Sequence, residues 1–187
     1  MATALWLMRH GETAWTLSGQ HTSSTDLPLT AEGERKAAAV GKMLAGKKFA
    51  AVYVSPMTRA KETCRIAGYA DGAIVTDDLC EWNYGAYEGL TSDQVHKTAP
   101  GWTIWNGAPP GGETVEDVAE RARRVIRAAP DGEVAIFGHG HMLRVLAACW
   151  LDVDPLMGRC FALSTGSISV LGYERDTRVI QRWNQTP

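Results

Sequence analysis

The chain has few cysteines and no long apolar run. Its four cysteines, Cys64, Cys80, Cys149 and Cys160, are scattered without a C-x-x-C spacing, so we expect reduced, mostly buried thiols rather than a disulfide framework. No apolar stretch approaches the length of a membrane-spanning helix. The N-terminus lacks the charged region, apolar segment and cleavage site of a secretory leader. These absences favour a cytoplasmic protein.

A strong excess of one charge is also absent. Lysine and arginine total 19 and aspartate and glutamate total 21, for a net charge of −2. This balance gives no electrostatic basis for binding nucleic acid or an anionic membrane, so any basic site must be local. The 187 residues, 45% hydrophobic and 21% charged, suit one globular domain with a full core. Repeats and low-complexity tracts are missing, and we expect a single domain over residues 1–187.

Strand and helix patterns alternate along the chain. Apolar runs typical of buried strands lie at 5–9, 51–54 and 133–137. Two alternating strand patterns follow near 161–173 and 178–183. Helices are expected at 30–46, from Ser55-Pro56, from the capping box at 91–94, at 114–129 and at 142–151. This order predicts an α/β fold, a three-layer α/β/α sandwich with a mixed, mostly parallel sheet.

Two irregular segments interrupt the alternation. Residues 11–29 are polar and rich in serine and threonine, and residues 77–112 are rich in aromatic side chains and glycine. Loops this long are unusual in a compact domain unless they are functional. We expect the loop 11–29 and the insert 77–112 to cap the active edge of the sheet.

Three of the predicted strands end on residues suited to binding an anion. The first ends on Arg9-His10-Gly11, the second leads into a helix with Arg59, and the third ends on Gly138-His139-Gly140-His141. Ligands of open α/β sheets bind beyond the carboxyl ends of the strands. The sequence therefore predicts a phosphate site at this edge.

The residue types at these strand ends suit phosphoryl transfer. Arg9 and Arg59 carry forked, permanently charged donors, and the helix after His139 offers free N–H groups and a favourable dipole. His10 can accept the phosphoryl group itself if its attacking nitrogen is unprotonated. Its other ring nitrogen then needs a fixed partner, such as a backbone carbonyl.

A carboxylic acid must also protonate the leaving oxygen. Glu81 is a candidate because bulky rings flank it in the sequence, and desolvation and phosphate charge both raise the pKa of a carboxyl group. Glu88 and Asp26 can be proposed on similar grounds. Sequence spacing alone does not choose among the three.

Together these motifs resemble the histidine phosphatase superfamily, whose fold is shared with cofactor-dependent phosphoglycerate mutases. The matching elements follow the family order over essentially the whole chain. They are Leu7-Met8-Arg9-His10-Gly11-Glu12-Thr13, Asp26-Leu27-Pro28-Leu29-Thr30, Ser55-Pro56 through Arg59 to Thr63, the Glu81 segment ending in Tyr87-Glu88-Gly89, Gly111-Gly112-Glu113-Thr114, and Gly138-His139-Gly140-His141. So many agreements in order are far more specific than a single short motif.

The resemblance implies a role for each matching residue. It implies that His10 is the phosphorylated nucleophile, that Arg9, Arg59 and His139 form the phosphate pocket, and that Glu81 is the proton donor and then the base toward water. It also implies backbone contacts to the phosphate from Gly140 and from Thr22 and Ser23. The chain departs from the common family pattern at Thr16, where many members have asparagine, and at Ser23, where glycine is frequent. Both departures concern substrate geometry more than reaction type.

The segment 15–22, the residues around Glu81 and the Trp102–Trp105 segment are similar to a branch containing sugar bisphosphatases and broad-specificity acid phosphatases. That similarity implies a phosphatase acting on small phosphorylated metabolites, sugar phosphates among them, without a metal or other cofactor. Trp15 and Trp82 are the tryptophans expected at the pocket rim. For Glu113 we expect a helix-capping role, with a hydrogen bond toward the site as the alternative.

Three other functions compete with this interpretation. A phosphoglycerate mutase would return the phosphate from its phosphohistidine, although mutases of the family are generally longer. A non-catalytic phosphate-binding regulatory module is disfavoured because every expected catalytic residue is present. A metal hydrolase would use His139 and His141 as ligands, but zinc needs a third protein ligand and the nearby arginines repel a cation. The oligomeric state stays open, with a homodimer among the options.

Overall fold

The computed structural model describes residues 2–187, and within them six strands form one mixed sheet. The strands are β1 (Ala2–Arg9), β2 (Ala51–Val54), β3 (Ile74–Val75), β4 (Gly132–Gly138), β5 (Ile168–Glu174) and β6 (Thr177–Gln185), in the order β3-β2-β4-β1-β5-β6. The pairs β3–β2, β2–β4 and β4–β1 are parallel, whereas β5 is antiparallel to β1 and to β6. The predicted mixed, mostly parallel sheet is confirmed.

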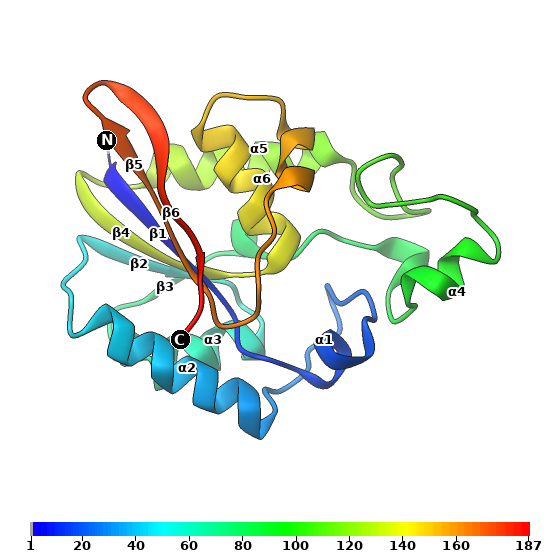
Figure 1. Ribbon diagram of the computed structural model, residues 1–187, viewed down its shortest axis with the longest axis horizontal. Coiled ribbons are helices and arrows are strands. Elements are labelled where there is room, and N and C mark those ends of the chain that lie inside the picture. The colour runs from blue at the N-terminus through cyan, green and yellow to red at the C-terminus, as the bar shows by residue number, and fades with distance from the viewer. Residues whose placement is uncertain (1) are drawn as a thin grey trace.

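Helices cover both faces of this sheet (Figure 1). One face carries α2 (Ala31–Leu44) and α3 (Thr58–Ile66), and the other carries α5 (Val115–Ala128) and α6 (Gly140–Trp150). Two apolar clusters fill the spaces between the layers. Side chains of β1 alternate between the two clusters, with Leu5 and Leu7 toward α5 and α6 and Met8 toward α2 and α3. A buried parallel strand needs apolar residues on both faces, which explains the continuous run in β1.

The helix starts follow from local chemistry that the sequence already displays. The Thr30 hydroxyl accepts a hydrogen bond from the Gly33 backbone N–H at 3.0 Å at the start of α2. Capping boxes begin α4 (Ser92–His96) at Thr91 and α5 at Thr114. These side chains satisfy backbone donors that the first helical turn leaves free. The predicted helices at 30–46, 91–94 onward and 114–129 are confirmed to within two residues.

The start of α3 differs from its prediction. The helix begins at Thr58 rather than at Ser55-Pro56, and the Ser55 hydroxyl is bound to His139 Nε2 at 2.7 Å. A carboxylate from a distant loop supplies the cap instead: Asp26 accepts hydrogen bonds from the Thr58 N–H at 2.8 Å and the Thr58 hydroxyl at 2.6 Å. The cap is a tertiary contact that local sequence does not reveal.

Three other elements differ from the expected pattern. The polar segment 11–29 contains the short helix α1 (Ala14–Ser18), capped by Thr13 and ended by Gly19 at a φ of 74°. The strand expected near 161–173 begins only at Ile168, because a 3-10 helix, Pro155–Cys160, and a loop precede it. The two-residue strand β3 was not expected.

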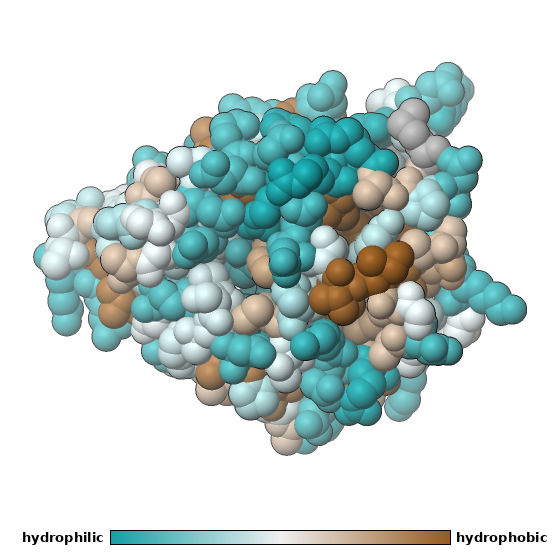
Figure 2. Space-filling view, turned by 180° about the vertical axis from the view of Figure 1, so that it is seen from behind, coloured by the Kyte–Doolittle hydropathy of each residue, from teal (hydrophilic) through white to brown (hydrophobic). Residues whose placement is uncertain are grey.

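One face of the molecule is largely polar. The face seen from behind is mainly hydrophilic, with small separate hydrophobic patches (Figure 2). None of the helices between residues 2 and 187 has both the length and the apolar character needed to cross a membrane.

Candidate active site

The carboxyl ends of β1, β4 and β2 meet at one edge of the sheet. His10 directly follows β1, His139 is the N-cap of α6 after β4, and Ser55 follows β2. The His10 backbone N–H donates to the Gly138 carbonyl at 3.0 Å, which extends the β1–β4 pairing by one residue. The two imidazole rings therefore lie close together, with centroids 5.1 Å apart.

The His10 ring is held in one tautomer. Its Nδ1 lies 2.7 Å from the Gly11 carbonyl oxygen, an acceptor only, so Nδ1 carries the proton and donates it. Burial, followed by the charges of Arg9 and Arg59, lowers the pKa of His10 well below 6.5. The ring is therefore neutral near pH 7, with the lone pair on Nε2.

Arg9 brings a positive charge to the same place. One of its guanidinium N–H groups donates to the Leu163 carbonyl, while its Nε is buried and bonds to no residue in the described part of the chain. Gly140 allows the close approach, since a Cβ there would lie 3.2 Å from the guanidinium carbon of Arg9. A buried donor without an acceptor is costly, and a bound anion would remove that cost.

Arg59 and His139 form a fixed pair beside the His10 ring. The Arg59 Nε–H donates to His139 Nδ1 at 3.2 Å, so the His139 proton resides on Nε2 and is donated to Ser55 Oγ. The other guanidinium nitrogens of Arg59 donate to the carbonyls of Ser23 and Thr25, both at 3.0 Å. The pKa of His139 is lowered well below 6.5 by burial and by neighbouring positive charge. Arg59 is fully buried yet keeps two of its five donors uncommitted.

The Glu81 side chain lies against the N-terminus of α6. Its Oε1 accepts hydrogen bonds from the backbone N–H groups of Trp82 and Met142, at 3.0 and 2.8 Å, and its Oε2 accepts one from His141 at 3.0 Å. These contacts fix the carboxyl group against the helix N-terminus, a favourable position for negative charge. Oε2 keeps a lone pair free for a ligand.

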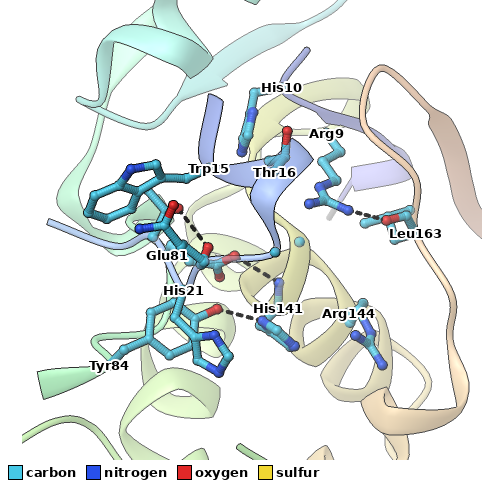
Figure 3. A pocket seen from close by; sticks show the side chains of 14 residues that line it. Arg9, His10, Trp15, Thr16, His21, Glu81, Tyr84, His141, Arg144 and Leu163 are labelled. Carbon is cyan, nitrogen blue, oxygen red and sulfur yellow. Dashed lines mark hydrogen bonds between the residues drawn. The ribbon is translucent and has the colours of Figure 1, made fainter. Parts of the chain in front are cut away.

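A cavity of about 230 Å³ connects these groups (Figure 3). It is lined by Arg9, His10, Trp15, Thr16, Gly19, Gln20, His21, Thr22, Glu81, Tyr84, Gly140, His141, Arg144 and Leu163. Residues from both the 11–29 segment and the 77–112 insert therefore contribute to its wall. Arg59 and His139 are not among these lining residues; the His139 ring contacts His10 with the ring centroids 5.1 Å apart.

The expected binding residues are distributed unevenly around this cavity. Thr22 and Gly140 line it, as does Thr16, whose hydroxyl donates to the Thr13 carbonyl at 2.9 Å. Ser23 lies outside the lining and is bound to Glu88. Trp82 does not lie at the rim as expected: it is fully buried, and its indole N–H donates to the Glu113 carbonyl at 2.8 Å. The indole belongs to the core because its one polar atom is satisfied there.

The structure separates the three candidate acids by position. Asp26 caps α3. The Glu88 carboxylate accepts hydrogen bonds from Ser23 and from the Thr25 N–H. Only Glu81 of these three carboxyl groups lines the cavity that contains His10.

The expected capping role of Glu113 is wrong. Thr114 caps α5, and the Glu113 carboxylate instead forms a bidentate pair with Arg121 at 2.9 and 2.8 Å and accepts the Asn83 N–H at 2.9 Å. Arg121 also donates to the carbonyls of Asp78 and Cys80. This pair holds the segment that carries Glu81.

Several wall residues were missed by reasoning from the sequence. Tyr84 and His141 lie on the far side of the cavity from His10, with the Tyr84 hydroxyl 2.6 Å from His141 Nδ1. Arg144 stacks on the Trp105 ring at 4.7 Å from its centroid. His21 lies on the loop between α1 and the Ser23 turn. Of these residues, only His141 has a local signal, its place in Gly138-His139-Gly140-His141 at the end of a predicted strand.

The site offers anion-binding groups rather than a cluster of metal ligands. Over residues 2–187, no group of three or more His, Cys, Asp or Glu side chains is arranged to hold a metal ion. Arg9 and Arg59 instead supply buried positive charge next to the neutral His10 imidazole and a carboxyl group. This arrangement on the carboxyl edge of a mixed α/β/α sandwich defines a phosphoryl-transfer site.

Comparison with known proteins agrees with that definition. The chain belongs to the histidine phosphatase superfamily (branch 1), whose profile matches residues 5–186. An acid phosphatase from Mycobacterium tuberculosis is 36% identical over 180 residues, covering 93% of this chain and 88% of that protein. Sedoheptulose 1,7-bisphosphatase from Saccharomyces cerevisiae is 31% identical, covering 91% of this chain and 75% of that protein.

The fold is shared with solved structures over nearly its full length. The structure of an open reading frame product from Mycobacterium tuberculosis superposes with a TM-score of 0.92 at 34% identity, covering 98% of this chain and 97% of that one. Phosphoglycerate mutases also occur among the relatives. Because the relatives include an acid phosphatase and a sugar bisphosphatase, assignment as a phosphomonoesterase of the histidine phosphatase type fits better than assignment as a mutase.

Proposed function

We propose that this protein hydrolyses small phosphate monoesters through a covalent phosphohistidine at His10. The observation that carries the proposal is the state of the His10 ring: Nδ1 is committed to the Gly11 carbonyl, the pKa is held low, and Nε2 is free at the wall of a cavity. A neutral imidazole with one nitrogen bound and the other exposed to a ligand is an activated nucleophile.

The first step forms a bond between His10 Nε2 and phosphorus and breaks the bond to the leaving oxygen. Glu81 acts as the general acid and gives a proton to that oxygen, and the alcohol departs. Arg9 and Arg59 stabilise the charge on the non-bridging oxygens, because buried donors that need no reorganisation act strongly in such a site. The N–H groups at the start of α6 add to this stabilisation.

The second step returns the enzyme to its starting state. Glu81, now a carboxylate, removes a proton from a water molecule as the water oxygen bonds to phosphorus. The bond between Nε2 and phosphorus breaks, and inorganic phosphate leaves. One carboxyl group thus serves as acid and then as base.

We also propose that the chain forms a single domain in which the segments 11–29 and 77–112 cap the site. A cavity of about 230 Å³ suits a small phosphorylated metabolite, and likeness to a sugar bisphosphatase favours a sugar phosphate. The four cysteines among the described residues are free thiols, which supports a reducing, cytoplasmic setting.

The decisive experiment is release of inorganic phosphate from phenyl phosphate without a bisphosphate primer and with a strong chelator present. We expect turnover together with an acid-labile, base-stable phosphoenzyme after rapid quenching. His10→Ala should abolish both, with a loss of roughly 10³-fold or more in kcat. Strict primer dependence would instead favour the mutase, and unchanged activity in His10→Ala would refute the covalent mechanism.

A further inference from the structure

A second cavity adjoins the one that contains His10. It has a volume of about 250 Å³ and is lined by His21, Ser92, His96, Trp102, Thr103, Ile104, Trp105 and His141. His21 and His141 belong to the walls of both cavities. None of the eight residues is a lysine, arginine, aspartate or glutamate. The lining consists of two indole rings, three imidazole rings, two hydroxyl groups and the Ile104 side chain.

The His21 ring is fixed in position but makes no hydrogen bond to any residue of the 2–187 range. Its backbone is paired with the insert, since its N–H donates to the Leu90 carbonyl and its carbonyl accepts from the Gly89 N–H, both at 2.9 Å. Its ring packs edge-on against Tyr84, with centroids 4.9 Å apart, and lies tilted against Trp102 at 5.6 Å. Two ring nitrogens in an ordered, half-buried imidazole are thus free for a ligand.

His141 presents one further free nitrogen. The Tyr84 phenol, whose pKa is raised by burial, has His141 Nδ1 as its hydrogen-bond partner at 2.6 Å. The phenol donates, because a buried hydroxyl without an acceptor would be costly. The proton of the neutral ring is then on Nε2, so His141 offers a donor.

The reaction geometry directs the leaving alcohol to this place. The leaving oxygen lies opposite the attacking nitrogen in an in-line displacement, and it must lie within reach of Glu81. Glu81 is bonded to the His141 N–H, and Figure 3 shows His21, Tyr84 and His141 on the side of Glu81 away from His10. The group attached to the leaving oxygen therefore extends past His21 and His141.

We propose that the second cavity is a specificity subsite for an uncharged, polyhydroxylated ring, and that His21 is the residue that selects it through hydrogen bonds to its hydroxyls. This proposal rests on the proposed phosphatase function, and it specifies the class of alcohol to which the phosphate is attached. Indole faces pack against the C–H surface of a sugar ring, while imidazole nitrogens bind its hydroxyl edge. An additional anionic group would find no lysine or arginine in this lining.

The test compares glucose 6-phosphate with phenyl phosphate, which has a flat ring without hydroxyls. Substituting His21→Phe keeps a ring and removes both nitrogens, whereas His21→Gln retains a donor and an acceptor. Leu17→Ala is the matched control, since Leu17 is exposed on the same segment and lines neither cavity.

We expect the ratio of kcat/KM for glucose 6-phosphate over phenyl phosphate to fall at least tenfold in His21→Phe and to recover partly in His21→Gln. The ratio should stay within twofold of wild type in Leu17→Ala. A ratio unchanged in His21→Phe would overturn the proposal.

A binding measurement separates failure of the subsite from failure of the proposed function. Calorimetry in a His10→Gln background should show glucose 6-phosphate binding more tightly than inorganic phosphate, with the difference lost when His21→Phe is added. If wild type releases no phosphate from any ester, the proposed function is wrong and the binding difference still decides the subsite. Equal affinities with and without the His21 substitution would refute it.

Discussion

The Glu88 carboxylate binds Ser23 through both the backbone N–H, at 2.9 Å, and the side-chain hydroxyl, at 2.5 Å. The same carboxylate accepts the Thr25 N–H at 3.0 Å. The carbonyls of Ser23 and Thr25 in turn receive the guanidinium of Arg59. Glu88 thus holds a turn that orients a buried cation without lining the cavity.

Substituting Glu88→Gln should therefore reduce kcat/KM for phenyl phosphate by about 10- to 100-fold, because one amide oxygen cannot replace two carboxylate oxygens as acceptors. Steady-state kinetics would measure the loss. Glu32→Gln is the control, since the Glu32 carboxylate forms only an exposed pair with Arg35. If both variants behave alike, Glu88 does not support Arg59.

Substituting Glu81→Gln should slow the enzyme according to its leaving group. An amide cannot donate a carboxylic proton, so an alkyl phosphate should lose about 10²- to 10⁴-fold in kcat. A nitrophenyl ester, whose leaving oxygen needs no proton, should lose much less in the step that forms the phosphoenzyme. Burst kinetics on the two esters distinguish these cases, and equal losses would mean that Glu81 is not the acid.

Stability should fall as the solution becomes acidic. Burial is the main cause that lowers the pKa values of His10, His139 and His141 well below 6.5 in the folded protein, so below pH 6.5 the unfolded chain binds more protons. The stabilisation is present above pH 6.5 and is lost as the pH falls, by about 1.4 kcal/mol per pH unit for each histidine.

Urea unfolding at pH 7.5, 6.5 and 5.5 would measure this slope. Substituting His141→Gln should make it shallower by about the contribution of one histidine. Parallel stability curves for wild type and variant would show that His141 is not buried in its neutral form.

The Arg121–Glu113 pair should both stabilise the fold and position Glu81. Substituting Arg121→Met removes the donor to the carbonyls of Asp78 and Cys80 and leaves the Glu113 carboxylate with only the Asn83 N–H. We expect a loss of about 2 kcal/mol or more in the free energy of unfolding, together with a lower kcat. Arg124→Met, which removes an exposed pair with Asp78, should leave both nearly unchanged; similar effects in the two variants would contradict a special role for Arg121.

Local patterns in the sequence predicted much of this protein. The apolar run of β1 and the threonine caps of α2, α4 and α5 depend on residues within a few positions of one another, so they can be read directly. The grouping of Arg9, His10 and His139 was also predictable, because parallel strands place their carboxyl ends at one edge.

Tertiary structure alone decided which carboxyl group shares a cavity with His10 and where the tryptophans lie. Glu81, Glu88 and Asp26 look alike in the sequence, and their roles depend on partners 32 to 65 positions away. The burial of Trp82 and the absence of a hydrogen-bond partner for the His21 ring within residues 2–187 also depend on contacts with distant segments. Caps and strand patterns arise from nearest neighbours along the chain, whereas the hydrogen-bond partners of a loop side chain depend on the path of every segment packed around it.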